Sequence, residues 1–192
     1  MNLFPLLLAR PAGALTAPFG LAQLGTVVAL AGLYGLLAIP LGLASGLLRP
    51  PWRGLTTRTW LQLAGSLLLM PALMEEGIFR VLLLPRPLSD LELKAQLAWA
   101  GLSVGLFVLY HPVAGRLWYP PGRPLFEQAR FLLPCSLLPC SLLGAICVIA
   151  YGWSGSLWAP VLIHWLTVLI WLGPGDGARD LTDRRSARRT AH

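Results

Sequence analysis

Residues 67–85 read LLLMPALMEEGIFRVLLLP, so two glutamates and an arginine lie between two strongly apolar runs. A charged side chain at the centre of a membrane helix costs about 2.5–3.5 kcal/mol on insertion scales, and such residues usually mark functional sites. Carboxylates are also groups that transfer protons and bind metal ions. Glu75, Glu76 and Arg80 are therefore the first candidates for a functional site.

The composition of the chain indicates an integral membrane protein. Of its 192 residues 56% are hydrophobic and only 12% charged, whereas a soluble domain usually carries about 25% charged residues. The charged residues are too few to cover a water-facing surface, and we expect one compact, all-α polytopic bundle. The net charge is +7, but the basic residues lie between apolar runs and in the tail. They would meet lipid headgroups there, and no nucleic-acid partner is expected.

The apolar segments predict about five membrane spans, one of them kinked or broken near the candidate site. Pro71 lies inside the second span and is expected to break it. A hinge is expected at residues 151–155, between the last two spans. The spans are predicted near residues 20–44, 59–84, 95–115, 131–150 and 156–173.

The spans divide the chain into three expected regions. These are an N-terminal span with a basic loop (1–58), a membrane core (59–173) and a basic, disordered tail (174–192). If five segments span, the 49–58 loop, the 116–130 loop and the tail share one side, and they hold most of the 15 basic residues. The positive-inside rule makes that side, and hence the C-terminus, cytoplasmic. The arginine-rich composition is typical of a GC-rich bacterial genome and suggests the bacterial inner membrane.

This topology predicts an irregularity. A straight second span would carry Glu75 toward the outer half of the membrane, whereas His111 would lie near the inner half. If the two belong to one site, a span must be broken, tilted or re-entrant, and Pro71 and Pro112 are the expected places. A different number of spans is the alternative.

The charged cluster contains one pair and one unpaired carboxyl. Glu76 and Arg80 are four residues apart and share a helix face, so an ion pair is expected. Glu75 points about 100° away from that face and has no partner on its own helix. An unpaired carboxyl suits a general base that takes a proton from water. The alternative is that both glutamates belong to a short interfacial loop.

Two histidines lie in other apolar segments. His111 follows Phe107 by four residues, so the two rings share a helix face, and Pro112 biases His111 away from helical geometry. A simple interfacial histidine is the alternative for this position. His164 lies in the middle of the last span, where it needs a polar partner. We therefore expect both histidines to converge on the two glutamates and Arg80.

The cysteines indicate no site of their own. Cys135, Cys140 and Cys147 lie within one apolar run and form no CxxC pair. Neither a disulfide framework nor a cysteine zinc site is therefore expected. A buried cysteine behaves as a small hydrophobic residue, and we interpret the three as helix packing.

Three short patterns in order resemble one family. Glu-Glu-x-x-x-Arg at 75–80, Phe-x-x-x-His at 107–111 and a later intramembrane histidine at 164 resemble the CPBP intramembrane proteases. These are relatives of the type II CAAX prenyl endopeptidase and of bacteriocin-processing and immunity proteins. The resemblance covers roughly residues 59–173. It implies hydrolysis of a peptide bond in a membrane-associated peptide or protein, with Phe107 in a supporting role.

The resemblance also implies a role for each polar residue. Glu75 would activate the attacking water, supported by Glu76 and Arg80. His111 and His164 would position that water, bind a metal or stabilise the oxyanion of the tetrahedral intermediate. Glu75, His111 and His164 could together ligate zinc. Both a zinc enzyme and a metal-free enzyme therefore stay open.

The chain departs from the family pattern in its last motif, which is usually His-x-x-x-Asn or Asp. The residue four positions after His164 is Val168, which cannot form a hydrogen bond, and Thr167 lies about 100° off that face. This departure supports an alternative: a catalytically weak or inactive immunity or scaffold protein that binds a peptide or a partner helix. Membrane lipids and a membrane-associated peptide are the expected partners in either case.

Overall fold

The computed structural model describes residues 10–44, 48, 56–118 and 134–172. Within those ranges the fold is all-helical and contains no strand, as the composition predicted. The predicted tail at 174–192 lies outside the described residues, as do most of the two basic loops predicted at 49–58 and 116–130.

The helices fall close to the predicted spans. A short helical segment at residues 10–15 precedes them. The remaining elements are α2 (Leu21–Ala44), α3 (Thr57–Leu67), η1 (Leu68–Leu73), α4 (Met74–Glu76), η2 (Gly77–Leu82), η3 (Leu88–Asp90), α5 (Leu93–Trp118), α7 (Pro134–Ser154) and α8 (Trp158–Leu172).

Four of these elements form one interrupted helix. Thr56 caps the start of α3, where its hydroxyl accepts a hydrogen bond from the Thr59 backbone N–H at 3.2 Å. The helix continues through η1, α4 and η2, but Met70 leaves helical geometry with φ −141° and ψ 111°. Proline disfavours the helical region for the residue before it, so Pro71 accounts for this break. The predicted kink in the second span is therefore present.

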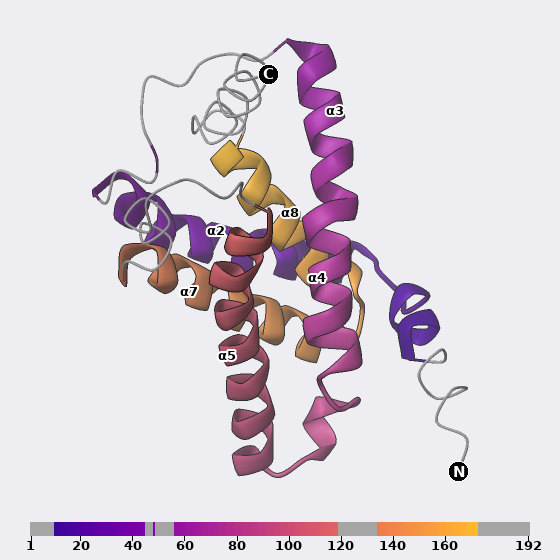
Figure 1. Cartoon of the computed structure of the whole chain (residues 1–192). Coiled ribbons are helices and arrows are strands. Elements are labelled where there is room, and N and C mark those ends of the chain that lie inside the picture. The colour runs from indigo at the N-terminus through magenta and orange to yellow at the C-terminus, as the bar shows by residue number, and fades with distance from the viewer. Residues whose placement is uncertain (1–9, 45–47, 49–55, 119–133, 173–192) are drawn as a thin grey trace.

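Helices α2, α7 and α8 pack together beside the interrupted helix and α5. In Figure 1, α5 and the α3–η2 segment run up the view, whereas α2 and α7 run across it. Helix α7 contacts α5, α2 and α8, and α2 and α8 also contact each other directly. Trp165 of α8 donates its indole N–H to the Ala64 carbonyl of α3 at 2.8 Å, which ties the last helix to the interrupted one.

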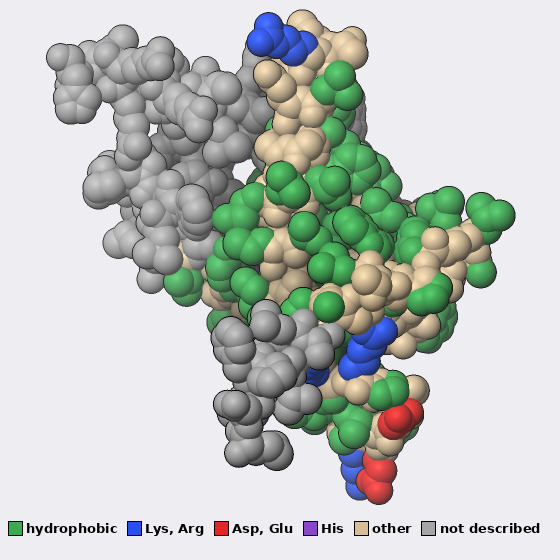
Figure 2. Space-filling view, turned by 90° about the vertical axis from the view of Figure 1, so that its right-hand side faces the viewer, with side chains coloured by type: hydrophobic (Ala, Val, Ile, Leu, Met, Phe, Trp, Pro, Cys, Tyr) green, Lys and Arg blue, Asp and Glu red, His purple; other side chains and the backbone are tan. Residues whose placement is uncertain are grey.

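The outer surface of this bundle is apolar. Helices α2, α5 and α7 each contain a stretch long and apolar enough to cross a membrane, and α8 is a shorter apolar helix. On the face shown in Figure 2, hydrophobic side chains cover the middle and charged side chains gather toward its two ends. Many large apolar side chains are exposed, among them Leu36, Leu69 and Leu109. Lipid is the environment that such a surface fits, and the chain is an integral membrane protein.

Of two further expectations about helix breaks, one is wrong and the other is confirmed in part. Helix α5 runs through Pro112 without interruption, and His111 is helical. Membrane helices tolerate an internal proline, because neighbouring groups compensate for the one lost backbone hydrogen bond. The hinge expected at 151–155 is shorter, since α7 continues to Ser154 and the chain reverses at Gly155. Gly155 adopts φ +61°, a conformation that glycine reaches without a steric penalty.

Candidate active site

Glu76 is the centre of a buried polar network. Its Oε2 lies 2.9 Å from Arg80 Nε, and both side chains are fully buried. Its Oε1 accepts a hydrogen bond from His164 Nδ1 at 2.8 Å. Arg80 also donates from Nη2 to the Gly144 carbonyl of α7 at 3.3 Å. One carboxylate therefore connects the interrupted helix to α8, and its arginine partner connects that helix to α7.

Glu75 faces the two histidines. Its Oε2 lies 3.8 Å from His164 Nε2 and 3.9 Å from His111 Nε2. Both separations exceed a direct hydrogen bond, and this buried oxygen has no hydrogen-bond partner among the described residues. His111 is partly exposed, whereas His164 is buried. The oxygen therefore lies between one buried and one partly exposed imidazole.

The Phe107 ring supports the site from within the core. It is fully buried, and its centroid lies 4.6 Å from that of His111 and 5.7 Å from that of His164. The Arg80 guanidinium carbon lies 4.7 Å from the same centroid, a cation–π distance. Phe107 therefore contacts three of the five polar residues singled out in the sequence. The structure brings all five of those residues together.

Both imidazoles are oriented by their Nδ1 atoms. His111 Nδ1 lies 2.8 Å from the Phe107 carbonyl oxygen, which can only accept, so this nitrogen carries the proton. His164 Nδ1 likewise faces the Glu76 carboxylate. In the neutral rings both Nε2 atoms then hold lone pairs. Three acceptor atoms, these two nitrogens and Glu75 Oε2, consequently face one another.

Helix α7 contributes contacts that the sequence analysis missed. The Cys140 sulfur lies 3.6 Å from His111 Nδ1, and Gly144 accepts from Arg80. Cys147 is fully buried and contacts the Pro160 carbonyl of α8. Positions 140, 144 and 147 share a helix face, and this spacing was the available signal. The interpretation of Cys140 as simple packing is therefore incomplete.

The structure supplies no substitute for the polar residue missing from the last motif, which begins at His164. Thr167 donates its hydroxyl to the Ile163 carbonyl of its own helix at 2.9 Å. Its hydroxyl hydrogen is therefore used within α8. Val168 is partly buried and offers no polar atom. Neither residue supplies the free polar group, Asn or Asp, that the family pattern places one turn after His164.

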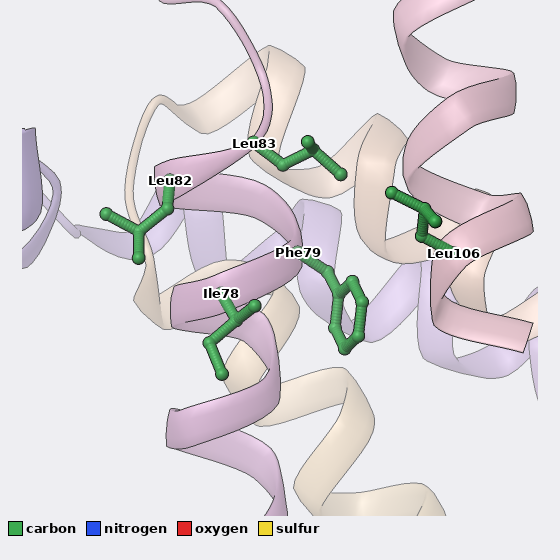
Figure 3. Close-up of a pocket in the computed structure, with 5 residues that line it drawn as sticks. All are labelled: Ile78, Phe79, Leu82, Leu83 and Leu106. Carbon is green, nitrogen blue, oxygen red and sulfur yellow. The ribbon is translucent and has the colours of Figure 1, made fainter. Parts of the chain in front are cut away.

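An apolar groove lies next to the site, between η2 and α5. It has a volume of about 240 Å³ and is lined by Ile78, Phe79, Leu82, Leu83 and Leu106. Figure 3 shows Phe79 and Leu106 on facing elements, with Ile78 and Leu82 on the outer side of η2. Phe79 lines this groove and also packs edge-to-face against Phe107, with the ring centroids 5.4 Å apart.

The three candidate zinc ligands, Glu75, His111 and His164, lie farther apart than ligands of one zinc ion. Three atoms bound tetrahedrally to zinc at about 2.0–2.1 Å lie about 3.3 Å from one another. The Glu75 oxygen is farther than this from both Nε2 atoms. No group of three or more His, Cys, Asp or Glu side chains within the described ranges is arranged to hold a metal ion. As the side chains stand they do not fit zinc, and no step below is assigned to a metal.

The described residues thus place two buried glutamates on an interrupted helix, where they face histidines from two further helices. The profile of the Rce1-like type II CAAX prenyl endopeptidases matches residues 56–170, more than half of the chain. The chain belongs to this family, which confirms the resemblance seen in the sequence. No curated protein and no solved structure matches the chain.

Proposed function

We propose that the protein is an intramembrane endopeptidase that hydrolyses a peptide bond with water activated by Glu75. The observation that carries this proposal is the Glu75 Oε2 atom, which is buried without a hydrogen bond from any described residue and faces two imidazole nitrogens. Family membership supports a protease with protein or peptide substrates. The apolar surroundings favour a substrate held at the membrane.

The arrangement of acceptors suits one water molecule. Polar groups separated by 3.8–3.9 Å are at the spacing that a bridging water fills. A water there would donate one hydrogen to Glu75 and the other to an Nε2 atom. Glu75 would then remove a proton while the oxygen attacks the substrate carbonyl carbon. The same proton would pass to the departing amine nitrogen, so that water and peptide give one carboxylic acid and one amine.

The remaining polar residues would position this water. Glu76 fixes the His164 ring through Nδ1 and is itself held by Arg80. The Phe107 carbonyl fixes His111 in the same way. Each imidazole therefore presents its Nε2 atom toward Glu75. Once protonated, either ring would also be a donor to the oxyanion, as the family resemblance implies.

Val168 supports a second candidate function. Without a donor at this position, and with the Thr167 hydroxyl bonded to Ile163, the oxyanion site has one donor fewer than the family pattern. A site that binds a peptide without efficient turnover would serve an immunity or scaffold protein. This candidate predicts that binding persists in the absence of cleavage.

The membrane topology completes the proposal. The three long apolar helices, the shorter α8 and the interrupted helix support five membrane segments. The distribution of arginine in the sequence supports a cytoplasmic C-terminus, and the composition suggests a bacterial inner membrane. The regions proposed above, 1–58, 59–173 and 174–192, follow from the same pattern.

The test compares the wild type with Glu75→Gln, each purified in detergent. Both are incubated with membrane peptides of the host, and new termini are identified by mass spectrometry. We expect cleavage by the wild type alone, because glutamine keeps the shape of glutamate but cannot take a proton. Equal cleavage by both proteins would disprove the role of Glu75. Binding of peptides by both proteins without any cleavage would favour the scaffold function.

A further inference from the structure

Gly144 of α7 lies directly behind the site. A Cβ atom at this position would lie 3.2 Å from Phe107 Cδ1 and 3.4 Å from Val104 Cγ1. Its carbonyl accepts the Arg80 Nη2 hydrogen bond at 3.3 Å. This one residue therefore contacts both the aromatic ring and the guanidinium that support the polar network.

The aromatic ring transmits that contact to the histidines. Phe107 is fully buried and cannot move without displacing its neighbours. Its ring lies against His111, His164 and Arg80 at centroid distances between 4.6 and 5.7 Å. A displacement of Phe107 by a few tenths of an ångström would therefore change the position of both imidazoles relative to Glu75.

A glycine is needed at this position for space and not for backbone conformation. Position 144 lies within the regular helix α7, where glycine lowers helix stability relative to alanine. Gly101 and Gly105 of α5 differ from it, since a Cβ there would meet no atom within 4 Å. Close packing of α7 against Phe107 is thus the physical reason for Gly144.

We propose that Gly144 is a positioning residue of the active site: its lack of a side chain sets the place of the Phe107 ring, and through that ring the places of His111 and His164. The inference rests on the proposed function for its catalytic consequence. Its geometric part concerns helix packing alone and is tested separately. No motif of the family resemblance includes this position.

The catalytic test uses Gly144→Ala, with Gly105→Ala on α5 as the matched control. A misplacement of about 1 Å costs on the order of 10²-fold in rate, and the smaller shift expected for Gly144→Ala should lower kcat roughly tenfold. KM should stay near the wild-type value, and the control should keep both constants. Adding Val104→Ala removes the 3.4 Å contact and should restore part of kcat. An unchanged kcat in folded Gly144→Ala would overturn the inference.

The geometric test needs no activity. The chain has three histidines, and isotope labelling gives their ring resonances, assigned with His111→Gln and His164→Gln. Because an aromatic ring at 4.6 Å shifts the resonances of its neighbour, Gly144→Ala should move the His111 signals, whereas Gly105→Ala should not. If Gly144→Ala is poorly folded, the double variant with Val104→Ala is measured instead; it keeps the 3.2 Å contact with Phe107, so its His111 signals must still move more than those of Gly105→Ala.

The two measurements separate the inference from the function. His111 resonances that match the wild type in a folded Gly144→Ala variant would overturn the inference, whatever the activity. Shifted resonances in a protein that never cleaves peptides would support the positioning role and disprove the protease function. Shifted resonances together with a lower kcat would support both.

Discussion

At the scale of the residue, the two adjacent glutamates have different surroundings. Glu76 is fully buried, pairs with Arg80 and accepts from His164. The buried Oε2 atom of Glu75 has no hydrogen bond within the described part of the chain and faces the histidines at longer range. Burial without a charged partner suits a carboxyl that exchanges a proton, whereas the paired carboxyl suits a structural role. The two positions should therefore respond differently to the same substitution.

Glu76→Gln should destabilise the protein as well as inactivate it. The substitution leaves the Arg80 guanidinium buried without its ion partner, and breaking such a pair costs about 3–5 kcal/mol. Thermal unfolding in detergent, followed by circular dichroism, measures the effect. Glu75→Gln is the matched control and should unfold near the wild-type temperature. Equal stability of the two variants would contradict the structural role of Glu76.

Val168→Asn should raise the rate of cleavage. Position 168 follows His164 by four residues and shares its helix face, so an amide there would donate to the developing oxyanion. One such donor is worth roughly 10²–10³-fold in kcat. Steady-state kinetics of Val168→Asn beside Val168→Leu, which adds no donor, measure the gain. If both variants resemble the wild type, the valine is not the missing element of the oxyanion site.

At the scale of the element, the break in the second helix positions the glutamates. Pro71 forces Met70 out of helical geometry, and the chain re-enters the helix just before Glu75. The π-helical turn η2 follows the pair, and such turns are frequent at functional sites. A straight helix would place the carboxylates at another depth and on another face.

Pro71→Ala should therefore reduce activity without unfolding the protein. Alanine lets Met70 adopt helical geometry, so Glu75 would shift relative to the histidines. A shift of about 1 Å lowers the rate on the order of 10²-fold. Pro139→Ala is the control, because α7 already runs through Pro139 as a continuous helix. Activity that falls equally in both variants would show that the break has no special role.

At the scale of the whole molecule, α7 is in contact with α2, α5, α8 and η2. This helix carries no charged side chain, yet it holds Arg80 through Gly144 and contacts His111 through Cys140. The glutamates come from the interrupted helix, and the histidines come from α5 and α8. Four helices thus build the site. The interrupted helix, α5 and α8 carry its glutamates, arginine and histidines, and α7 supports them.

The orientation of the molecule is testable in vesicles. A tag after His192 should be cleaved by an added protease in inverted vesicles and protected in right-side-out vesicles, because the basic tail is expected on the cytoplasmic side. A tag before Met1 should show the opposite pattern if five segments span. The same accessibility for both tags would mean an even number of spans.

Composition and residue spacing alone determined the fold class, one ion pair and one helix break of this protein. The low proportion of charged residues predicted an all-α membrane bundle, and the i,i+4 spacing predicted the Glu76–Arg80 pair. Pro71 predicted the break, because the effect of proline on the preceding residue is local. These features depend on neighbours in the chain, so a linear pattern contains them.

Contacts between distant segments were decided only by the tertiary structure. The hydrogen bond from His164 to Glu76 joins residues far apart in the chain, and nothing in the spacing distinguishes Glu76 from Glu75 as its acceptor. Pro112 was expected to disturb α5 but does not, since a proline in a membrane helix is accommodated by its surroundings. The role of Gly144 is visible only where α7 meets Phe107. Packing between helices depends on the shapes of both partners, and a single chain segment specifies only one of them.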